Sequence, residues 1–77
     1  MNLRQLEVFQ AVLHTGSMSV AARLLCITPS AVSKAVAHTE LQLGYRLFNR
    51  TPAGLTPTPE AQVLAVDSGR SYRQLHA

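Results

Sequence analysis

The sequence has one cysteine, few acidic residues and no long apolar run. The single thiol, Cys26, excludes an internal disulfide framework and a zinc site built from several cysteines. No apolar run approaches the roughly 20 residues of a membrane span, and the first residues are too polar for a signal peptide. These absences predict a soluble cytoplasmic protein that does not interact with membranes.

The residue combinations that simple enzymes use are also missing. There is no recognisable nucleophile and base pair, no paired carboxylates and no glycine-rich phosphate loop. The three histidines, His14, His38 and His76, lie on different predicted elements without metal-site spacing. A chain of 77 residues has room for one small core. We therefore expect a single domain with no enzyme activity, no cofactor and no metal.

The scarcity of acidic residues gives the chain a positive charge. Seven Lys and Arg residues oppose four Asp and Glu residues, for a net charge of +3 and a pI of about 9.8. Both ends of the chain sum to zero, and the excess is central, where Arg23, Lys34, Arg46 and Arg50 oppose Glu40 alone. This distribution indicates a polyanionic partner, with random scatter of surface charge as the alternative.

Helical periodicity of the apolar residues predicts two helices at the start of the chain. The first spans about residues 3–15, because Asn2 can cap it and a glycine follows it. Ser17 can cap a second, short helix. The adjacent Ala21 and Ala22 allow another helix to approach closely, as in two short helices that pack at a steep angle across a tight turn. Within that turn, we expect Cys26 to be a buried structural thiol, with a redox switch as the alternative.

A third helix is predicted to begin at Pro29, because Thr28 can cap it and proline is favoured at the first helical position. Its inward stripe has helical spacing: Val32, Val36, Thr39 and Leu43. The opposite side holds small or polar groups around one cation: Pro29, Ser30, Ser33, Lys34, Ala37 and His38. Short hydroxyl side chains and a lysine can approach base edges and phosphates in the major groove of DNA. The alternative for Ser30 and Ser33 is a solvated or capping role.

A small β-hairpin is expected next, from the alternating run 45–48, the turn 51–54 and the segment 55–57. Thr58 can then cap a last helix, which carries one stripe: Ala61, Leu64, Ala65, Ser68, Tyr72 and Leu75. No stop signal precedes the end of the chain, so we expect this helix to be cut short. A partner subunit is the preferred cover for the stripe, in parallel or antiparallel pairing, and a lone core helix is the alternative.

Together these elements predict a mainly α fold, a winged helix-turn-helix. It has three helices, a short two-stranded wing and a long C-terminal linker helix. We expect a DNA-binding domain over residues 1–58 and a linker or dimerisation helix over 59–77. A protein-interaction module built on the same scaffold is the alternative to a DNA-binding module.

The sequence resembles the DNA-binding domain of LysR-type transcriptional regulators. The resemblance lies in Leu6–Phe9, Gly16–Met18, Ala21–Leu25, Ser30–Lys34, Leu43–Gly44, Leu47–Arg50 and Pro57–Ala61. It implies a bacterial regulator that binds double-stranded operator or promoter DNA, with the third helix in the major groove and the wing at the minor groove or backbone. It also implies a homodimer through the last helix, a tetramer as an alternative in the full-length protein, RNA polymerase as a further partner, and an effector-binding domain that this chain does not contain.

The resemblance assigns DNA contacts to Thr28, as cap and phosphate ligand, and to positions 29, 30, 33 and 34. His38 is expected near phosphate, Arg50 and Arg46 at the wing, and Ala53 at a wing position that is often basic in the family. The side chain of Arg46 could instead pair with Glu40, and Arg23 is a further backbone-contact candidate. Family members often carry glutamine where Pro29 stands and arginine where Lys34 stands, so base preference is expected to differ.

Overall fold

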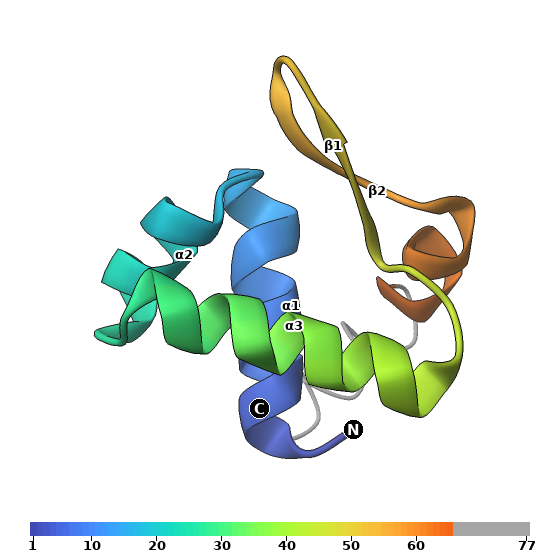
Figure 1. Cartoon of the computed structure of the whole chain (residues 1–77), viewed down its shortest axis with the longest axis horizontal. Helices are drawn as coiled ribbons and strands as arrows, with labels where there is room; N and C mark the ends of the chain where they lie inside the picture. The colour runs from blue at the N-terminus through green and yellow to red at the C-terminus, as the bar shows by residue number, and fades with distance from the viewer. Residues whose placement is uncertain (66–77) are drawn as a thin grey trace.

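The computed structural model describes residues 1–65. It contains helices α1 (Leu3–Thr15), α2 (Met18–Leu25) and α3 (Pro29–Leu43), strands β1 (Phe48–Thr51) and β2 (Gly54–Pro57), and a further helical segment over residues 59–65. Figure 1 shows α3 crossing in front of α1, with the hairpin projecting away from the helices. The predicted winged helix-turn-helix is confirmed.

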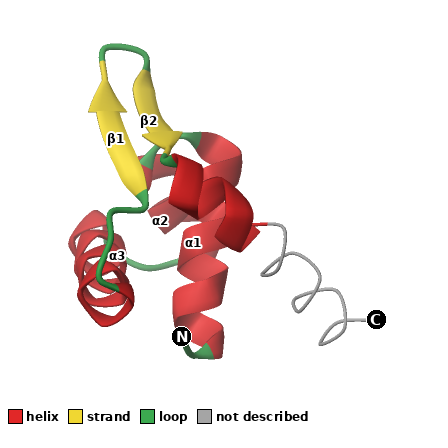
Figure 2. Ribbon diagram, turned by 90° about the vertical axis from the view of Figure 1, so that its right-hand side faces the viewer, coloured by secondary structure: helices red, strands yellow, loops and turns green. Residues whose placement is uncertain are grey.

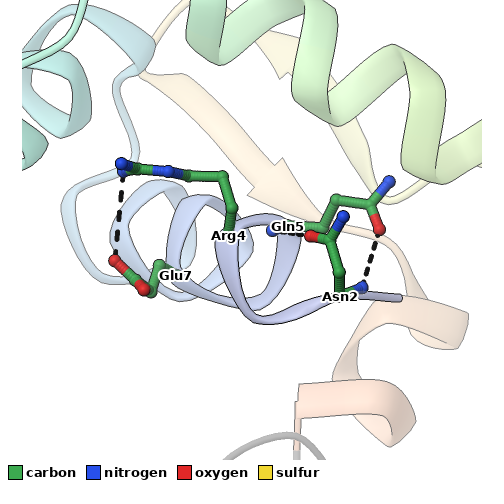
Figure 3. Close-up of polar contacts among 4 residues, drawn as sticks. All are labelled: Asn2, Arg4, Gln5 and Glu7. Atoms are coloured by element: carbon green, nitrogen blue, oxygen red, sulfur yellow. Dashed lines mark hydrogen bonds and ion pairs between the residues drawn. The ribbon is translucent and has the colours of Figure 1, made fainter.

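The capping residues place the helices where the sequence predicts them. The side chain of Asn2 accepts a hydrogen bond from the backbone N–H of Gln5 at 2.8 Å, and the Gln5 side chain accepts one from the backbone N–H of Asn2 at 2.8 Å (Figure 3). At the other end of α1, Gly16 takes the left-handed conformation with φ 69°. The side chain of Ser17 caps α2 by accepting from the N–H of Val20 at 3.2 Å. These contacts are local, which is why the sequence alone predicts them.

One apolar core joins all the elements. Its buried members come from every helix and from the start of the wing: Val8, Phe9, Val12, Ala21, Ala22, Val32, Val36, Leu47, Phe48 and Ala61. The rings of Phe9 and Phe48 lie 5.7 Å apart, between their centroids, and so connect α1 to β1. The two alanines of α2 are at most 1% exposed, as the expected close helix approach requires.

The first strand begins later than the alternating run 45–48 predicts. Leu47 is completely buried, its N–H donates to the carboxylate of Glu40 at 2.7 Å, and its carbonyl accepts from the N–H of Thr58 at 3.0 Å. The backbone before Phe48 is therefore a connector bonded to α3 and to residue 58. The two strands pair in antiparallel register from Phe48 opposite Pro57 to Thr51 opposite Gly54.

The segment 59–65 follows the wing, and Figure 2 shows it in front of α1. Thr58 caps it, because its hydroxyl accepts from the N–H of Ala61 at 3.1 Å and donates to the carbonyl of Arg46 at 2.7 Å. Ala61 is 0% exposed within this chain, so the prediction that it faces a partner subunit is wrong. Leu64 and Ala65 are half-buried and pack on the same core. Ser68, Tyr72 and Leu75, the other predicted dimer residues, lie outside the described residues.

No single helix within residues 1–65 is long and apolar enough to span a membrane. α2 and α3 pass such a test of length and composition only as a pair, and that pair is bent by 107°.

Candidate nucleic-acid interface

The turn between α2 and α3 sets the direction of the third helix. The two axes are bent by 107°, within the range of a helix-turn-helix. Cys26 closes α2 in the left-handed conformation with φ 58°, and the N–H of Ile27 donates to the carbonyl of Ala22 at 3.0 Å. The side chain of Cys26 is exposed, so the prediction of a buried thiol is wrong. The left-handed backbone interrupts the helical periodicity here, and Ile27 rather than Cys26 packs against the core.

The first turn of α3 is capped from the exposed surface. The hydroxyl of Thr28 accepts a hydrogen bond from the N–H of Ala31 at 3.1 Å, and Pro29 occupies the first turn of the helix. Since the free backbone N–H groups at a helix start favour an anion, this end of α3 suits an approaching phosphate. The structure confirms the cap and leaves the phosphate contact of Thr28 as a prediction.

The two sides of α3 are separated as the sequence predicts. Val32, Val36 and Thr39 are at most 5% exposed, and the hydroxyl of Thr39 donates to the carbonyl of Ala35 at 2.8 Å, so this buried polar group has a partner. The opposite side is open to solvent along its length: Pro29, Ser30, Ser33, Lys34, Ala37 and His38 are all exposed. A surface of small and polar groups, with one lysine and no acidic residue, therefore faces outward.

Glu40 is the one acidic residue of α3, and its carboxylate is directed at the connector before β1. It accepts from the N–H of Leu47 rather than from Arg46; within residues 1–65 the one ion pair joins Arg4 and Glu7 on α1, at 4.0 Å (Figure 3). Arg46 is exposed. The alternative pairing of Arg46 with Glu40 is thus absent from this structure, and the guanidinium is open to solvent beside the C-terminal end of α3.

The wing is attached to the turn between α1 and α2. The N–H of Leu55 donates to the carbonyl of Gly16 at 3.0 Å, and a Cβ at Gly54 would lie 2.9 Å from the same oxygen. An open pocket of about 570 Å³ lies beside this contact; Arg50 and Ala53 line it from the wing, and Ser17 lines it from the start of α2. This anchorage does not follow from the sequence pattern, in which Gly16 and Gly54 are its only signal.

Figure 2 shows the wing and α3 on the same side of α1, and Figure 1 shows α3 crossing in front of α1. The hairpin tip extends furthest from the helices, and Pro52 and Ala53, which form its turn, are exposed. Arg50 is exposed on β1, opposite Leu55, and Arg23 is exposed on α2. The structure therefore gathers the predicted contacts of α3 and of the wing on one side of the molecule.

His14 and His38 are both exposed, and no three potential metal ligands come together within residues 1–65.

The sequence matches one family along most of its length. The sequence model of a family described as bacterial regulatory helix-turn-helix protein, LysR family, matches residues 3–62. The regulator DgcR of a Pseudoalteromonas species is 42% identical over the whole chain, and AceR of Acinetobacter baumannii is 52% identical over 63 residues, or 82% of the chain. The chain spans about a quarter of the first relative (26%) and 21% of the second.

The fold matches solved structures equally well. A complex of the DNA-binding domain of BenM with benA site 1 DNA superposes with a TM-score of 0.93 at 29% identity, covering 99% of this chain and 85% of that one. A complex of the CbnR DNA-binding domain with DNA gives a TM-score of 0.92 at 28% identity, covering 99% of this chain and 87% of that one.

Proposed function

Because the chain belongs to the LysR family of bacterial regulatory helix-turn-helix proteins, we propose that it binds double-stranded DNA sequence-specifically, as the DNA-binding part of a transcriptional regulator. The proposed role is regulatory and involves no catalysis. The cytoplasm is the proposed location, since that is where bacterial operators and promoters lie.

One observation supports this function most strongly: the exposed side of α3 is free of carboxylates, carries Lys34 and lies on the same side as the wing. An α-helix fits the major groove of B-DNA, and its base contacts come mainly from its N-terminal residues. Thr28, Pro29, Ser30, Ser33 and Lys34 occupy that part of α3 or cap it. We therefore place these five residues at the groove and its flanking phosphates.

The remaining proposed contacts lie further from the start of α3. His38 follows Lys34 by one helical turn and would meet phosphate at the edge of the groove. Arg50 and Arg46 would supply positive charge on the wing side, with Ala53 at the wing tip adding contact without charge. Electrostatic attraction of this kind positions a protein on DNA without reading sequence.

The helix that starts at residue 59 is the proposed dimerisation element, with the domain boundary at 58 and 59. Leu64 and Ala65 are half-buried and therefore retain surface for a partner helix, which Ala61 does not. A homodimer would place two α3 helices about one DNA turn, or a multiple of it, apart. A tetramer and contact with RNA polymerase are further proposals for the whole regulator.

Competition between duplexes tests the proposed function. A duplex selected from a random library by the chain should bind at least ~10³ times more tightly than mixed random-sequence duplex at ~0.1 M salt. Equal competition by the random duplex would reject sequence-specific binding and favour a protein-interaction module instead.

Two variants that each remove one positive charge locate the contact. Lys34→Gln should weaken binding and lower the salt slope by about 1 if the ammonium meets phosphate, or relax preference at one base position if it meets a base edge. Arg4 lies on α1, outside the proposed interface, so Arg4→Gln should leave the affinity, the salt slope and the base preference nearly unchanged. If the two variants bind DNA with equal affinity and equal salt dependence, Lys34 does not contact the DNA.

A further inference from the structure

The exposed side of α3 consists of two ridges with different chemistry. Residues four apart on an α-helix are neighbours along one ridge, about 6 Å apart along the axis. The first ridge holds Pro29, Ser33 and Ala37, and the second holds Ser30, Lys34 and His38; all six side chains are exposed. The first, the Pro29 ridge, has an apolar group at each end, whereas the second, the Lys34 ridge, is polar throughout.

The Pro29 ridge has little capacity for hydrogen bonding. Neither Pro29 nor Ala37 has a polar side-chain atom, and Ser33 between them has one hydroxyl. Among the groups that base pairs display in the major groove, the C5-methyl of thymine is apolar, and alanine is one of its usual contacts. The bidentate reading of adenine requires Asn or Gln, which this ridge lacks.

We propose that Pro29 and Ala37 recognise thymine methyl groups in the major groove, and that they are specificity-determining residues of this chain. This inference rests on the proposed DNA-binding function. The two residues are eight positions apart, or about 12 Å along the helix axis, a length close to three or four base pairs. They would therefore contact thymines on separate base pairs, with Ser33 between them.

The charge beside the Pro29 ridge favours DNA over an apolar protein partner. Lys34 projects from the adjacent ridge, and the carboxylate of Glu40 is engaged by the N–H of Leu47 at 2.7 Å. A duplex supplies methyl groups and phosphates together, so it satisfies both ridges at once. An apolar protein surface would leave the ammonium of Lys34 without a partner.

Deoxyuridine provides the test, because it keeps the hydrogen-bonding groups of thymine and lacks only the methyl. Each thymine in a duplex selected by the 77-residue chain is replaced in turn, and the dissociation constant is measured at fixed salt. Replacement at a contacted thymine should weaken binding about fourfold, which corresponds to about 0.8 kcal/mol for one buried methyl. Replacement at the other thymines should change affinity by less than about 1.5-fold, about 0.25 kcal/mol.

The variants Pro29→Ser and Ala37→Ser assign each methyl to a residue. Each should abolish the deoxyuridine effect at one thymine and retain it at the other. Leu41→Ser is the matched control, because Leu41 is an apolar residue that is 83% exposed on the same helix but lies four residues beyond Ala37, further from the start of α3. This control should keep both effects. Circular dichroism on all three variants verifies that α3 is folded.

The outcomes separate the inference from the function on which it rests. If the selected duplex outcompetes random DNA but no deoxyuridine replacement matters, or no thymine is selected, the inference fails and the proposed function stands. Deoxyuridine effects that persist in both Pro29→Ser and Ala37→Ser also overturn it, because another residue then contacts the methyl. If selected and random duplexes bind equally, both the function and the inference are wrong.

Discussion

Replacing Gly54 with alanine tests how the wing is held against the helices. Gly54 has φ 123°, and an added Cβ would lie 2.9 Å from the carbonyl oxygen of Gly16, closer than real Cβ atoms come to such an atom. The oxygen cannot retreat freely, because it accepts the N–H of Leu55 at 3.0 Å. The variant must therefore shift the wing, weaken this hydrogen bond, or both.

Gly44→Ala is the matched control. Gly44 also has a positive φ, 81°, but nothing lies within 4 Å of its would-be Cβ. Both variants place alanine at a positive φ, which costs about 1–2 kcal/mol near the left-handed helical region of Gly44 and more at the φ of 123° of Gly54, and both gain from a stiffer unfolded chain. Only Gly54→Ala also disturbs a hydrogen bond, which contributes about 1 kcal/mol.

The two variants should therefore differ by at least about 1 kcal/mol, which corresponds to a Tm difference of at least roughly 4–8 °C for a domain of this size. Gly54→Ala should have the lower Tm in thermal unfolding followed by circular dichroism. Equal Tm values would refute the reasoning, because they would mean that the Gly54–Gly16 contact does not constrain the wing.

Three further predictions concern single side chains. Glu40→Ala should destabilise the chain by about 1–3 kcal/mol in urea unfolding, because the N–H of the buried Leu47 loses its acceptor, whereas a loss below about 0.5 kcal/mol would contradict this. Cys26 should react with a thiol reagent in the native chain at a rate close to that of the unfolded chain, and strong protection would contradict its exposure. Thr28→Ala should cost about 1 kcal/mol of stability, because the N–H of Ala31 loses its cap, while Thr28→Ser should restore most of it.

Local signals in the sequence predicted the helices well. The caps at Asn2, Ser17 and Thr28 join residues three positions apart, so each is visible as a short pattern. The start of β1 was not predictable in this way. Leu47 is held by Glu40 from α3 and by Thr58 from beyond the wing, and these long-range contacts override the strand-like alternation of the run 45–48.

The candidate interface was predictable to the extent that it follows from helix periodicity. The inward stripe of α3 implies the outward one, and the structure confirms the exposure of Ser30, Ser33 and Lys34. Helical periodicity is broken at a left-handed residue, which is why the pattern wrongly predicts a buried side chain for Cys26. Nor does it reveal which subunit covers an apolar residue, so it assigned Ala61 to a dimer contact when the core of the chain encloses it.

Glu40 links the stability of the fold to the electrostatics of the interface. Its carboxylate reaches the N–H of Leu47, which fixes the connector leading into the wing. The same hydrogen bond directs the one negative charge of α3 toward the connector rather than toward the side that carries Lys34. A carboxylate on that side would repel DNA phosphates. A single contact therefore fixes the connector that leads into the wing and directs the carboxylate away from the side that carries Lys34.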